Sequence, residues 1–241
     1  MEERLDILVA KQLDISREKA KELIKNGHVT VDNKLIKKPA QLILVEMIIS
    51  VEMPDKIYVS RGGYKLASAI ENFEIQVDNQ ICMDIGASTG GFTDYLLQHG
   101  AKRVVAIDVG SNQLDVTLKN NEKVISLENT DIRDVDAAAF PPFDLIVMDV
   151  SFISLTHVLN AAFRLLKQTG DCICLVKPQF EAGSQHLNRS GVVRDKKVHQ
   201  KVMKKIAEHA TACGFQIENS MMSAITGKKG NHEYFYYLKK V

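Results

Sequence analysis

The loop "DIGASTGGFTDYLL" at residues 84–97 places three glycines and two small hydroxyl residues between an acidic residue and an amphipathic run. Glycine lets a backbone turn tightly and approach a ligand closely, so such a loop is suited to holding a small molecule. The dinucleotide pattern G-x-G-x-x-G is not met, because Ser88 stands at its second glycine position. The loop is therefore less suited to a pyrophosphate than a dinucleotide-binding loop is.

Two further acids follow apolar runs downstream. Asp108 closes "RVVAID", where a carboxylate can accept both hydroxyls of a ribose, and Asp131 in "TDIRD" follows the next run. Either acid alone would more often be a cap or turn former. The form D-x-G-x-S-x-G-G resembles motif one of the class I methyltransferases that use S-adenosylmethionine. That resemblance implies S-adenosylmethionine as the cofactor, bound by Asp84, Gly86, Ser88, Thr89, Gly90, Gly91, Phe92, Asp108, Val109, Asp131 and Ile132.

The later part of the chain narrows the methyl acceptor to oxygen. Exocyclic-amine methyltransferases usually carry an Asn- or Asp-Pro-Pro-aromatic loop at the point where this chain has "DVSF". Carbon-five pyrimidine methyltransferases need a nucleophilic cysteine, and none of Cys82, Cys172, Cys174 and Cys213 follows a strand at a polar position. An oxygen acceptor such as a ribose 2′-hydroxyl is a poor nucleophile and needs a base.

A cluster of two lysines and two carboxylates could supply that base. A lysine serves as a base only if its pKa falls well below ~10.4, and a second ammonium with partial desolvation would lower it. The residues concerned are Lys65, Asp149, Lys177 and Glu233. Each alone would more often be a solvated surface residue, but the set resembles the Lys-Asp-Lys-Glu tetrad of the FtsJ-like ribose 2′-O-methyltransferases. The resemblance implies Lys177 as the proton acceptor, with Asp149 and Glu233 hydrogen-bonded to it. Lys65 would position the ribose or its phosphate.

Positive charge is concentrated in residues 17–38 and 177–205, although the whole chain carries a formal net charge of only +1. Such patches favour a polyanionic partner, unless the lysines merely solvate helix faces. The segment "DISREKAKELIKNGHVTVDNKLI" predicts a helix capped at Asp14 or Ser16, followed by a strand-turn-strand. Together with R-L-D at residues 4–6, its pattern S-R-x-x-A-x-x-L-I-x-x-G-x-V-x-V resembles the S-four-like RNA-binding module.

This resemblance implies that the predicted helix faces structured RNA. The polar segment after Lys177, "PQFEAGSQHLNRSGVVRD", is longer than an ordinary connection and is a plausible substrate loop, or else a crossover with incidental charge. The residues that we expect to contact RNA are Arg4, Arg17, Lys19, Lys21, Lys25, Arg61, Arg189 and Arg194.

Five ordered stretches, "VSRGGYKL", "DIGASTGGFTD", "DVSFISL", "VKPQFEAG" and "GNHEYF", match the TlyA family, which joins an S-four-like module to an FtsJ-like domain. The resemblance covers essentially the whole chain. It implies methyl transfer from S-adenosylmethionine to the ribose 2′-hydroxyl of a cytidine in ribosomal RNA, with the ribosomal subunit as partner. Members also carry the label hemolysin, so a pore-forming cytolysin is one alternative. The other is a non-catalytic RNA-binding assembly factor, which the intact tetrad argues against.

The elements that must position these residues follow from alternation along the chain. From residue 63, apolar runs that end in polar residues alternate with helical or loop segments, which predicts buried, mostly parallel strands with helices on both faces. "FQIENSMMSA" and "EYFYYLKKV" predict a final antiparallel hairpin. The expected fold is α/β, a Rossmann-like class I methyltransferase with a seven-stranded, mostly parallel sheet. The expected domains are a small α+β RNA-binding domain with its linker over residues 1–59, and the methyltransferase domain over residues 60–241.

Composition sets the broad class. With 45% hydrophobic and 25% charged residues, the chain is close to the average for globular proteins. Its cysteines lack metal-ligand spacing and its histidines do not cluster, so we expect no metal. No stretch approaches the ~18 apolar residues that span a bilayer, and the start carries early acids and lacks a signal-like apolar core. We therefore expect a cytoplasmic protein without a membrane partner.

Overall fold

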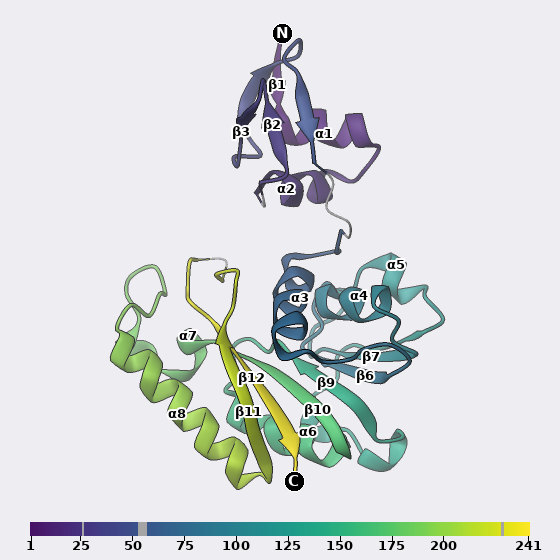
Figure 1. The fold of residues 1–241 in the computed structure, drawn as a ribbon, viewed down its shortest axis with the longest axis vertical. Helices are drawn as coiled ribbons and strands as arrows, with labels where there is room; N and C mark the ends of the chain where they lie inside the picture. Colours follow the sequence, from purple (N-terminus) through teal and green to yellow (C-terminus); the bar gives the residue numbers. More distant parts are fainter. Residues whose placement is uncertain (26, 53–56, 228) are drawn as a thin grey trace. The chain divides into compact units, whose positions relative to one another are not determined.

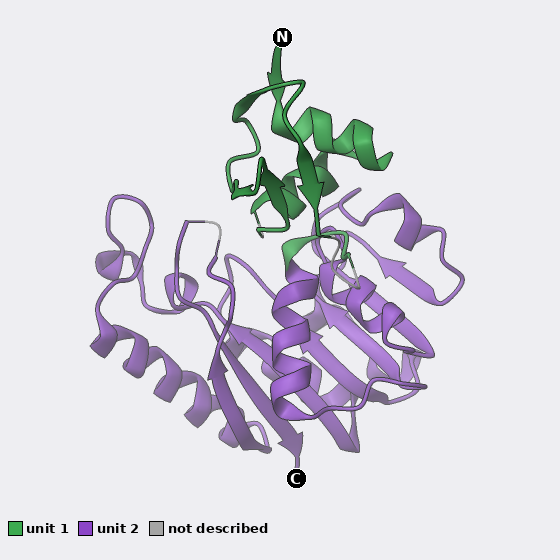
Figure 2. Cartoon of the chain, turned by 45° about the horizontal axis from the view of Figure 1, so that its top comes forward, with its two compact units in different colours: residues 1–61 green, residues 62–241 purple. Residues whose placement is uncertain are grey.

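The computed structural model describes all of residues 1–241 except 26, 53–56 and 228. The chain divides into two compact units, Met1–Arg61 (unit 1) and Gly62–Val241 (unit 2), which Figure 2 distinguishes by colour. Residues 53–56, near the end of the expected RNA-binding domain and its linker, lie outside the described part of the chain.

Unit 1 is an α+β domain in which two short helices pack against small antiparallel sheets. In chain order its elements are β1 (Glu2–Arg4), α1 (Leu5–Leu13), α2 (Arg17–Lys25), β2 (Val29–Val31), β3 (Lys34–Leu35), β4 (Leu42–Leu44) and β5 (Ile49–Val51). Strand β1 pairs with β4, and β2 pairs with both β3 and β5. Apolar side chains of both helices form its core with residues of β2 and β4, including Leu5, Val9, Leu23, Ile24, Val29 and Ile43.

Local sequence accounts for the ends of these elements. Ser16 caps α2, because its hydroxyl accepts from the backbone N–H of Lys19 at 3.3 Å. Asp14, the other predicted cap, instead ends α1 in a left-handed conformation with φ 51°. The turn between β2 and β3 has positive φ at both Asp32 and Asn33, as a type I′ hairpin requires.

Unit 2 contains the larger sheet and its covering helices. Its strands are β6 (Ile81–Ile85), β7 (Arg103–Ile107), β8 (Val124–Leu127), β9 (Phe143–Met148), β10 (Leu166–Val176), β11 (Phe215–Met222) and β12 (Tyr234–Lys240). Its α-helices are α3 (Arg61–Phe73), α4 (Gly91–Gln98), α5 (Val116–Lys119), α6 (Leu159–Leu165), α7 (Pro178–Glu181) and α8 (Lys196–Ala212). Single 3₁₀ turns are η1 (Ile132–Asp134), η2 (Ala137–Ala139), η3 (Leu155–His157) and η4 (Ser184–His186).

Within the described residues the sheet has seven strands in the order β11-β12-β10-β9-β6-β7-β8. Strand β12 is antiparallel to both neighbours and the other pairings are parallel, which confirms the predicted fold class and the final hairpin. The chain reverses direction across the sheet between β6 and β9. In open α/β sheets, ligands bind outside the carboxyl ends of the strands at such a switch point.

Helices cover both faces of the sheet (Figure 1). Alternate strand residues, among them Met83, Ile146 and Cys172, pack with apolar residues of α6 and α8. On the other face, α3 packs on β12 through Phe73 and Tyr237, whose rings lie 5.6 Å apart. Because the strands are buried on both faces, their carboxyl ends are held rigidly.

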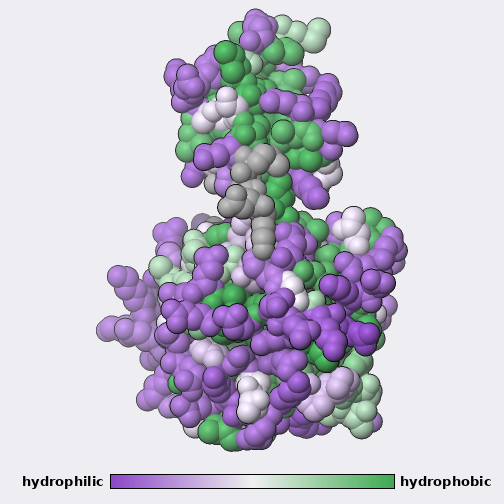
Figure 3. All heavy atoms as spheres, turned by 45° about the vertical axis from the view of Figure 1, so that its right-hand side comes forward, coloured by the Kyte–Doolittle hydropathy of each residue, from purple (hydrophilic) through white to green (hydrophobic). Residues whose placement is uncertain are grey.

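No helix in the described part of the chain is long and apolar enough to span a membrane. In the space-filling view of Figure 3, hydrophilic residues cover most of the visible face of the larger unit, with apolar residues scattered among them.

Candidate active site

The glycine loop follows β6 and turns directly into α4. Gly86 has φ +84°, and a Cβ there would lie 3.0 Å from the carbonyl oxygen of Asp149, at the end of the neighbouring strand β9. Gly90 has φ +93°, and its Cβ would lie 2.3 Å from Leu118. Side chains at these two positions would be strained and would collide, so the glycines are required for the loop to pass this closely.

Asp84 lies beneath this loop and is fully buried. Its Oδ2 accepts from Thr93 N at 2.9 Å and from Thr93 Oγ1 at 2.7 Å, which ties β6 to the start of α4. Its Oδ1 is buried without a hydrogen-bond partner among the described residues. Burial raises the pKa of Asp84 to about 7, because the charged carboxylate is desolvated.

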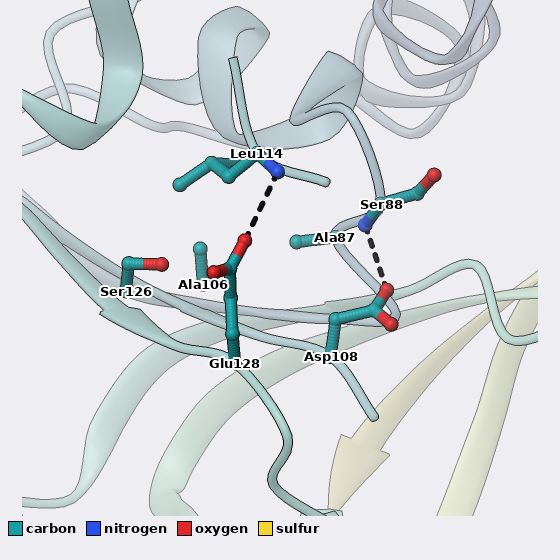
Figure 4. A pocket seen from close by; sticks show the side chains of 7 residues that line it. All are labelled: Ala87, Ser88, Ala106, Asp108, Leu114, Ser126 and Glu128. Atoms are coloured by element: carbon teal, nitrogen blue, oxygen red, sulfur yellow. Dashed lines mark hydrogen bonds between the residues drawn. The ribbon is translucent and has the colours of Figure 1, made fainter. Parts of the chain in front are cut away.

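A small pocket opens between the loop and the carboxyl ends of β7 and β8 (Figure 4). It is lined by Ala87, Ser88, Ala106, Asp108, Leu114, Ser126 and Glu128. Asp108 accepts backbone N–H groups with both oxygens, from Ser88 at 2.8 Å and from Gly110 at 2.8 Å. A carboxylate oxygen has two lone pairs, so Asp108 retains capacity for a ligand hydroxyl.

Glu128 is a pocket residue that sequence reasoning missed. It ends the run "VISLE" as Asp108 ends "RVVAID", a signal that could have found it. Its oxygens accept the backbone N–H groups of residues 112–114. The Lys119 ammonium donates to it at 2.7 Å and, as the largest cause, lowers the Glu128 pKa to about 2. Glu128 thereby fixes one wall of the pocket.

The other residues predicted to bind a cofactor have mixed positions. Thr89 and Gly91 belong to the loop and to the first turn of α4, whereas Phe92 and Ile132 are buried in the core and Val109 is 70% exposed. Asp131 caps η1, and the Arg133 guanidinium binds both of its oxygens and lowers its pKa. The carboxylate of Asp131 is thus already paired with Arg133, two residues later in the chain.

The four tetrad residues form two ion pairs. Lys177 Nζ lies 2.6 Å from Asp149 Oδ1, and Lys65 Nζ lies 2.6 Å from Glu233 Oε2. All four side chains are largely buried, Asp149 being the most exposed at 22%. Glu233 was expected to bond Lys177, but the structure pairs it with Lys65.

The segment 177–181, "KPQFE", connects these pairs to the rest of the site. Gln179 Nε2 donates to Glu233 Oε1 at 3.0 Å, only two residues beyond Lys177. Glu181 accepts from Ser154 Oγ at 2.6 Å and from Leu155 N at 2.8 Å, and so anchors the loop that follows Asp149. One short segment therefore contacts both ends of the cluster.

The loop after β9 contributes two further features. Ser151 Oγ accepts from Lys177 Nζ at 2.7 Å. Phe152 is 90% exposed and has φ +64°, and its ring lies 4.9 Å from that of Phe180. A bulky residue in a left-handed conformation is strained, and such strain concentrates at functional sites.

Sequence reasoning missed Ser151, Gln179 and Gly227. A Cβ at Gly227 would lie 2.5 Å from Glu233 Oε1, so this glycine leaves the space that Glu233 occupies. "GNHE" at residues 230–233 also holds the long loop after α7, because the Asn231 side chain bonds Val193 N and Gly191 O at 3.1 Å each. That loop exposes Arg189 and Arg194.

In unit 1, the predicted RNA-binding arginines have a structural partner. Arg4 and Arg17 both bind the buried carboxylate of Asp6, at 2.9 and 3.0 Å. The side-chain bond from Arg4 is the largest cause that lowers the Asp6 pKa to about 2. On α2, Lys21 and Lys25 pair with glutamates three residues earlier, and Lys19 is exposed. Arg61 begins α3.

Among the described residues, no three His, Cys, Asp or Glu side chains lie together in a way that could hold a metal ion. The four cysteines are free thiols. Burial raises the pKa of both Cys82 and Cys174 to about 12, so neither is activated as a nucleophile.

Known proteins resemble the chain over its whole length. The FtsJ-like methyltransferase family matches residues 58–240, and the S4 domain matches residues 3–49. The 23S rRNA (cytidine-2′-O)-methyltransferase TlyA of Campylobacter jejuni is 38% identical over 98% of this chain and 99% of its own. The 16S/23S rRNA (cytidine-2′-O)-methyltransferase TlyA of Mycobacterium tuberculosis is 40% identical over 96% of this chain and 87% of its own.

A solved structure described as a candidate hemolysin from Streptococcus thermophilus covers the whole chain and 89% of its own, with a TM-score of 0.77 and 39% identity. These matches confirm the family that the five sequence motifs predicted. The chain belongs to the FtsJ-like methyltransferase family and carries an S4 domain ahead of its methyltransferase domain.

Proposed function

We propose that this protein transfers a methyl group from S-adenosylmethionine to the 2′-hydroxyl of a cytidine ribose in ribosomal RNA, in the cytoplasm. The ribosomal subunit is the proposed partner. The methyl acceptor and the RNA class are those named for the relatives from Campylobacter jejuni and Mycobacterium tuberculosis.

One observation carries the proposal: a buried lysine–carboxylate cluster lies directly beside the glycine loop. The backbone of Gly86 lies so close to that of Asp149 that a Cβ on Gly86 would be 3.0 Å from the Asp149 carbonyl oxygen. Asp149 is in turn the ion-pair partner of Lys177. A small ligand held by the loop and a base on β10 therefore act at one strand-end edge of the sheet. This juxtaposition is what methyl transfer to a weak nucleophile needs.

The residues of the loop fit S-adenosylmethionine. Gly86 lets the loop lie against the backbone of Asp149, where a Cβ would come within 3.0 Å of the carbonyl oxygen, and the loop residues that follow it, Ala87 and Ser88, line the pocket. Asp108, at the carboxyl end of β7, retains lone pairs for the two ribose hydroxyls, and Glu128 fixes the pocket wall beside it. Asp131 can serve the adenine end only after its pairing with Arg133 loosens.

In the mechanism that we propose, bound S-adenosylmethionine would supply an electrophilic methyl carbon, whose bond to sulfur would break as the new O–C bond forms, leaving S-adenosylhomocysteine. Lys177, as the neutral amine, accepts the proton of the ribose 2′-hydroxyl, whose oxygen forms the new O–C bond. Asp149 holds this amine in place and compensates the positive charge that it gains. Lys65, fixed by Glu233, is the second ammonium and positions the ribose or its phosphate.

Phe152 supports a nucleic-acid substrate at this site. Its exposed ring lies beside Phe180, which in turn lies 5.8 Å from Lys177 Nζ. Sequence-specific RNA sites commonly stack an unpaired base on an aromatic side chain. A target nucleotide stacked on Phe152 would bring its ribose toward Lys177.

The experiment is transfer of labelled methyl from S-adenosylmethionine to ribosomal RNA that lacks the modification, followed by nucleoside mass spectrometry. The proposal predicts 2′-O-methylcytidine. Methyl groups on a base, or no transfer to free RNA or to ribosomal subunits, would contradict it. Release of vesicle contents by the pure protein would instead support a lytic activity.

The S4 domain is tested separately. Lys19 is exposed on α2 and Lys21 is half-buried on the same helix, and the double change to Gln should weaken RNA binding and reduce the slope of log affinity against log salt by about 2. Lys11→Gln is the control, because Lys11 lies on α1 and is not among the residues expected to contact RNA. An unchanged affinity and slope in the double variant would place the RNA surface elsewhere.

A further inference from the structure

Ser151 is the short-range hydrogen-bond acceptor for the Lys177 ammonium, with its Oγ 2.7 Å from Lys177 Nζ. Asp149 Oδ1 lies 2.6 Å from the same nitrogen as an ion-pair partner, without the geometry of a hydrogen bond. Lys177 Nζ also donates to the Asp149 carbonyl oxygen, at 3.4 Å. The Lys177 side chain is only 10% exposed, whereas Ser151 is an exposed residue.

These three contacts of the Lys177 ammonium differ in strength, and the weakest is lost first when the ammonium releases a proton. An ammonium group has three N–H bonds in fixed tetrahedral directions, and it can only donate. At 3.4 Å the bond to the Asp149 carbonyl is beyond the usual range of N–H···O distances, so it is the weakest of the three. A neutral amine, with one N–H fewer, keeps its bond to Ser151 Oγ and stays beside the Asp149 carboxylate.

The consequence concerns the lone pair of the amine. The Asp149 carboxylate attracts the N–H bonds by its charge but fixes none of them in a hydrogen bond, so by itself it leaves the direction of the lone pair open. The hydrogen bond to Ser151 Oγ fixes one N–H and restricts that choice. We propose that Ser151 is a positioning residue for methyl transfer, which orients the Lys177 amine so that its lone pair points away from both of these oxygens, toward the substrate hydroxyl.

The fold holds this contact from both sides. Lys177 immediately precedes α7, and Glu181 at the end of α7 accepts from Ser154 Oγ and Leu155 N. The loop that carries Ser151 is therefore anchored to the same short helix that follows the lysine. Because the two partners are fixed to one another, the 2.7 Å contact is preorganised and does not depend on substrate.

The test is the kinetics of Ser151→Ala in the full-length protein, with S-adenosylmethionine and unmodified ribosomal RNA. Loss of one hydrogen bond in the reactive geometry should lower kcat about tenfold. KM for RNA and the dissociation constant for the cofactor should stay within about twofold of the wild-type values. The melting temperature should stay within about 2 °C of the wild type. Ser151→Thr, which keeps the hydroxyl, should recover at least half of the lost rate. Ser220→Ala, at an exposed position of β11, is the matched control and should leave kcat unchanged.

Because this inference rests on the proposed function, wild type and Lys177→Met are measured beside it. An active wild type, an inactive Lys177→Met and an unchanged kcat in Ser151→Ala would overturn the role of Ser151 alone. A fall in kcat that matches a loss of folded protein, or that Ser151→Thr fails to recover, would also overturn it. An inactive wild type would overturn the proposed function and this inference with it.

Discussion

Replacing Asp84 by Asn should change how the stability of unit 2 depends on pH. Burial raises the pKa of Asp84 to about 7 from an ordinary 3.8, so across this window the folded chain keeps a proton that the unfolded chain has released. The contribution of Asp84 to the free energy of unfolding therefore falls as pH rises from about 4 to about 7. Between pH 5 and pH 7 the fall spans two pH units, or about 2.7 kcal/mol.

The assay is urea unfolding followed by circular dichroism at pH 5, 6, 7 and 8. In Asp84→Asn, the amide cannot ionise, so its free energy of unfolding relative to wild type should rise by about 2.7 kcal/mol from pH 5 to pH 7. Glu71→Gln removes an exposed carboxylate from α3 and should give a flat difference. A flat difference for Asp84→Asn as well would refute the argument that burial keeps this acid protonated.

Three further changes test other contacts. Glu233→Ala leaves the Lys65 ammonium without its 2.6 Å partner, so the free energy of unfolding should fall by about 3–5 kcal/mol; a loss below 1 kcal/mol in denaturant titrations would contradict this. Gly227→Ala places a Cβ 2.5 Å from Glu233 Oε1 and should slow methyl transfer roughly 10²-fold with cofactor affinity retained, and wild-type turnover would show that Glu233 can shift freely. Asp6→Asn should remove stability that wild-type unit 1 loses as pH falls from about 4 to about 2, because Arg4 lowers the Asp6 pKa; thermal melts that keep the wild-type acid dependence would disprove it.

The edge of the sheet that holds the site could be predicted because its strands are uniformly apolar and end in polar residues. Asp108, Asp149 and Lys177 all follow such runs, and parallel strands bring their carboxyl ends to one edge. Helix and strand periods likewise predicted the alternation of helices and strands after residue 63 and the final hairpin. These features depend on local pattern, which a single sequence carries.

Pairing between distant residues could not be predicted in the same way. Which carboxylate meets which lysine depends on β12 lying antiparallel beside β10, and this brings Glu233 to Lys65 across 168 residues of sequence. Ser151 and Gln179 have no sequence signal of their own, because their role arises from the loop and the short helix that aim them at charged partners. Asp6 was noted only as part of a motif, and its burial between two arginines required the packed unit 1.

The central claim is that the Lys177 amine is the base for methyl transfer. Its most direct test is single-turnover methyl transfer by Lys177→Met, which removes the amine but keeps an unbranched side chain, with cofactor affinity measured by calorimetry on the same protein. We predict a rate lower by about 10²–10⁴-fold with unchanged affinity for S-adenosylmethionine. A rate close to that of the wild type would show that another group removes the proton.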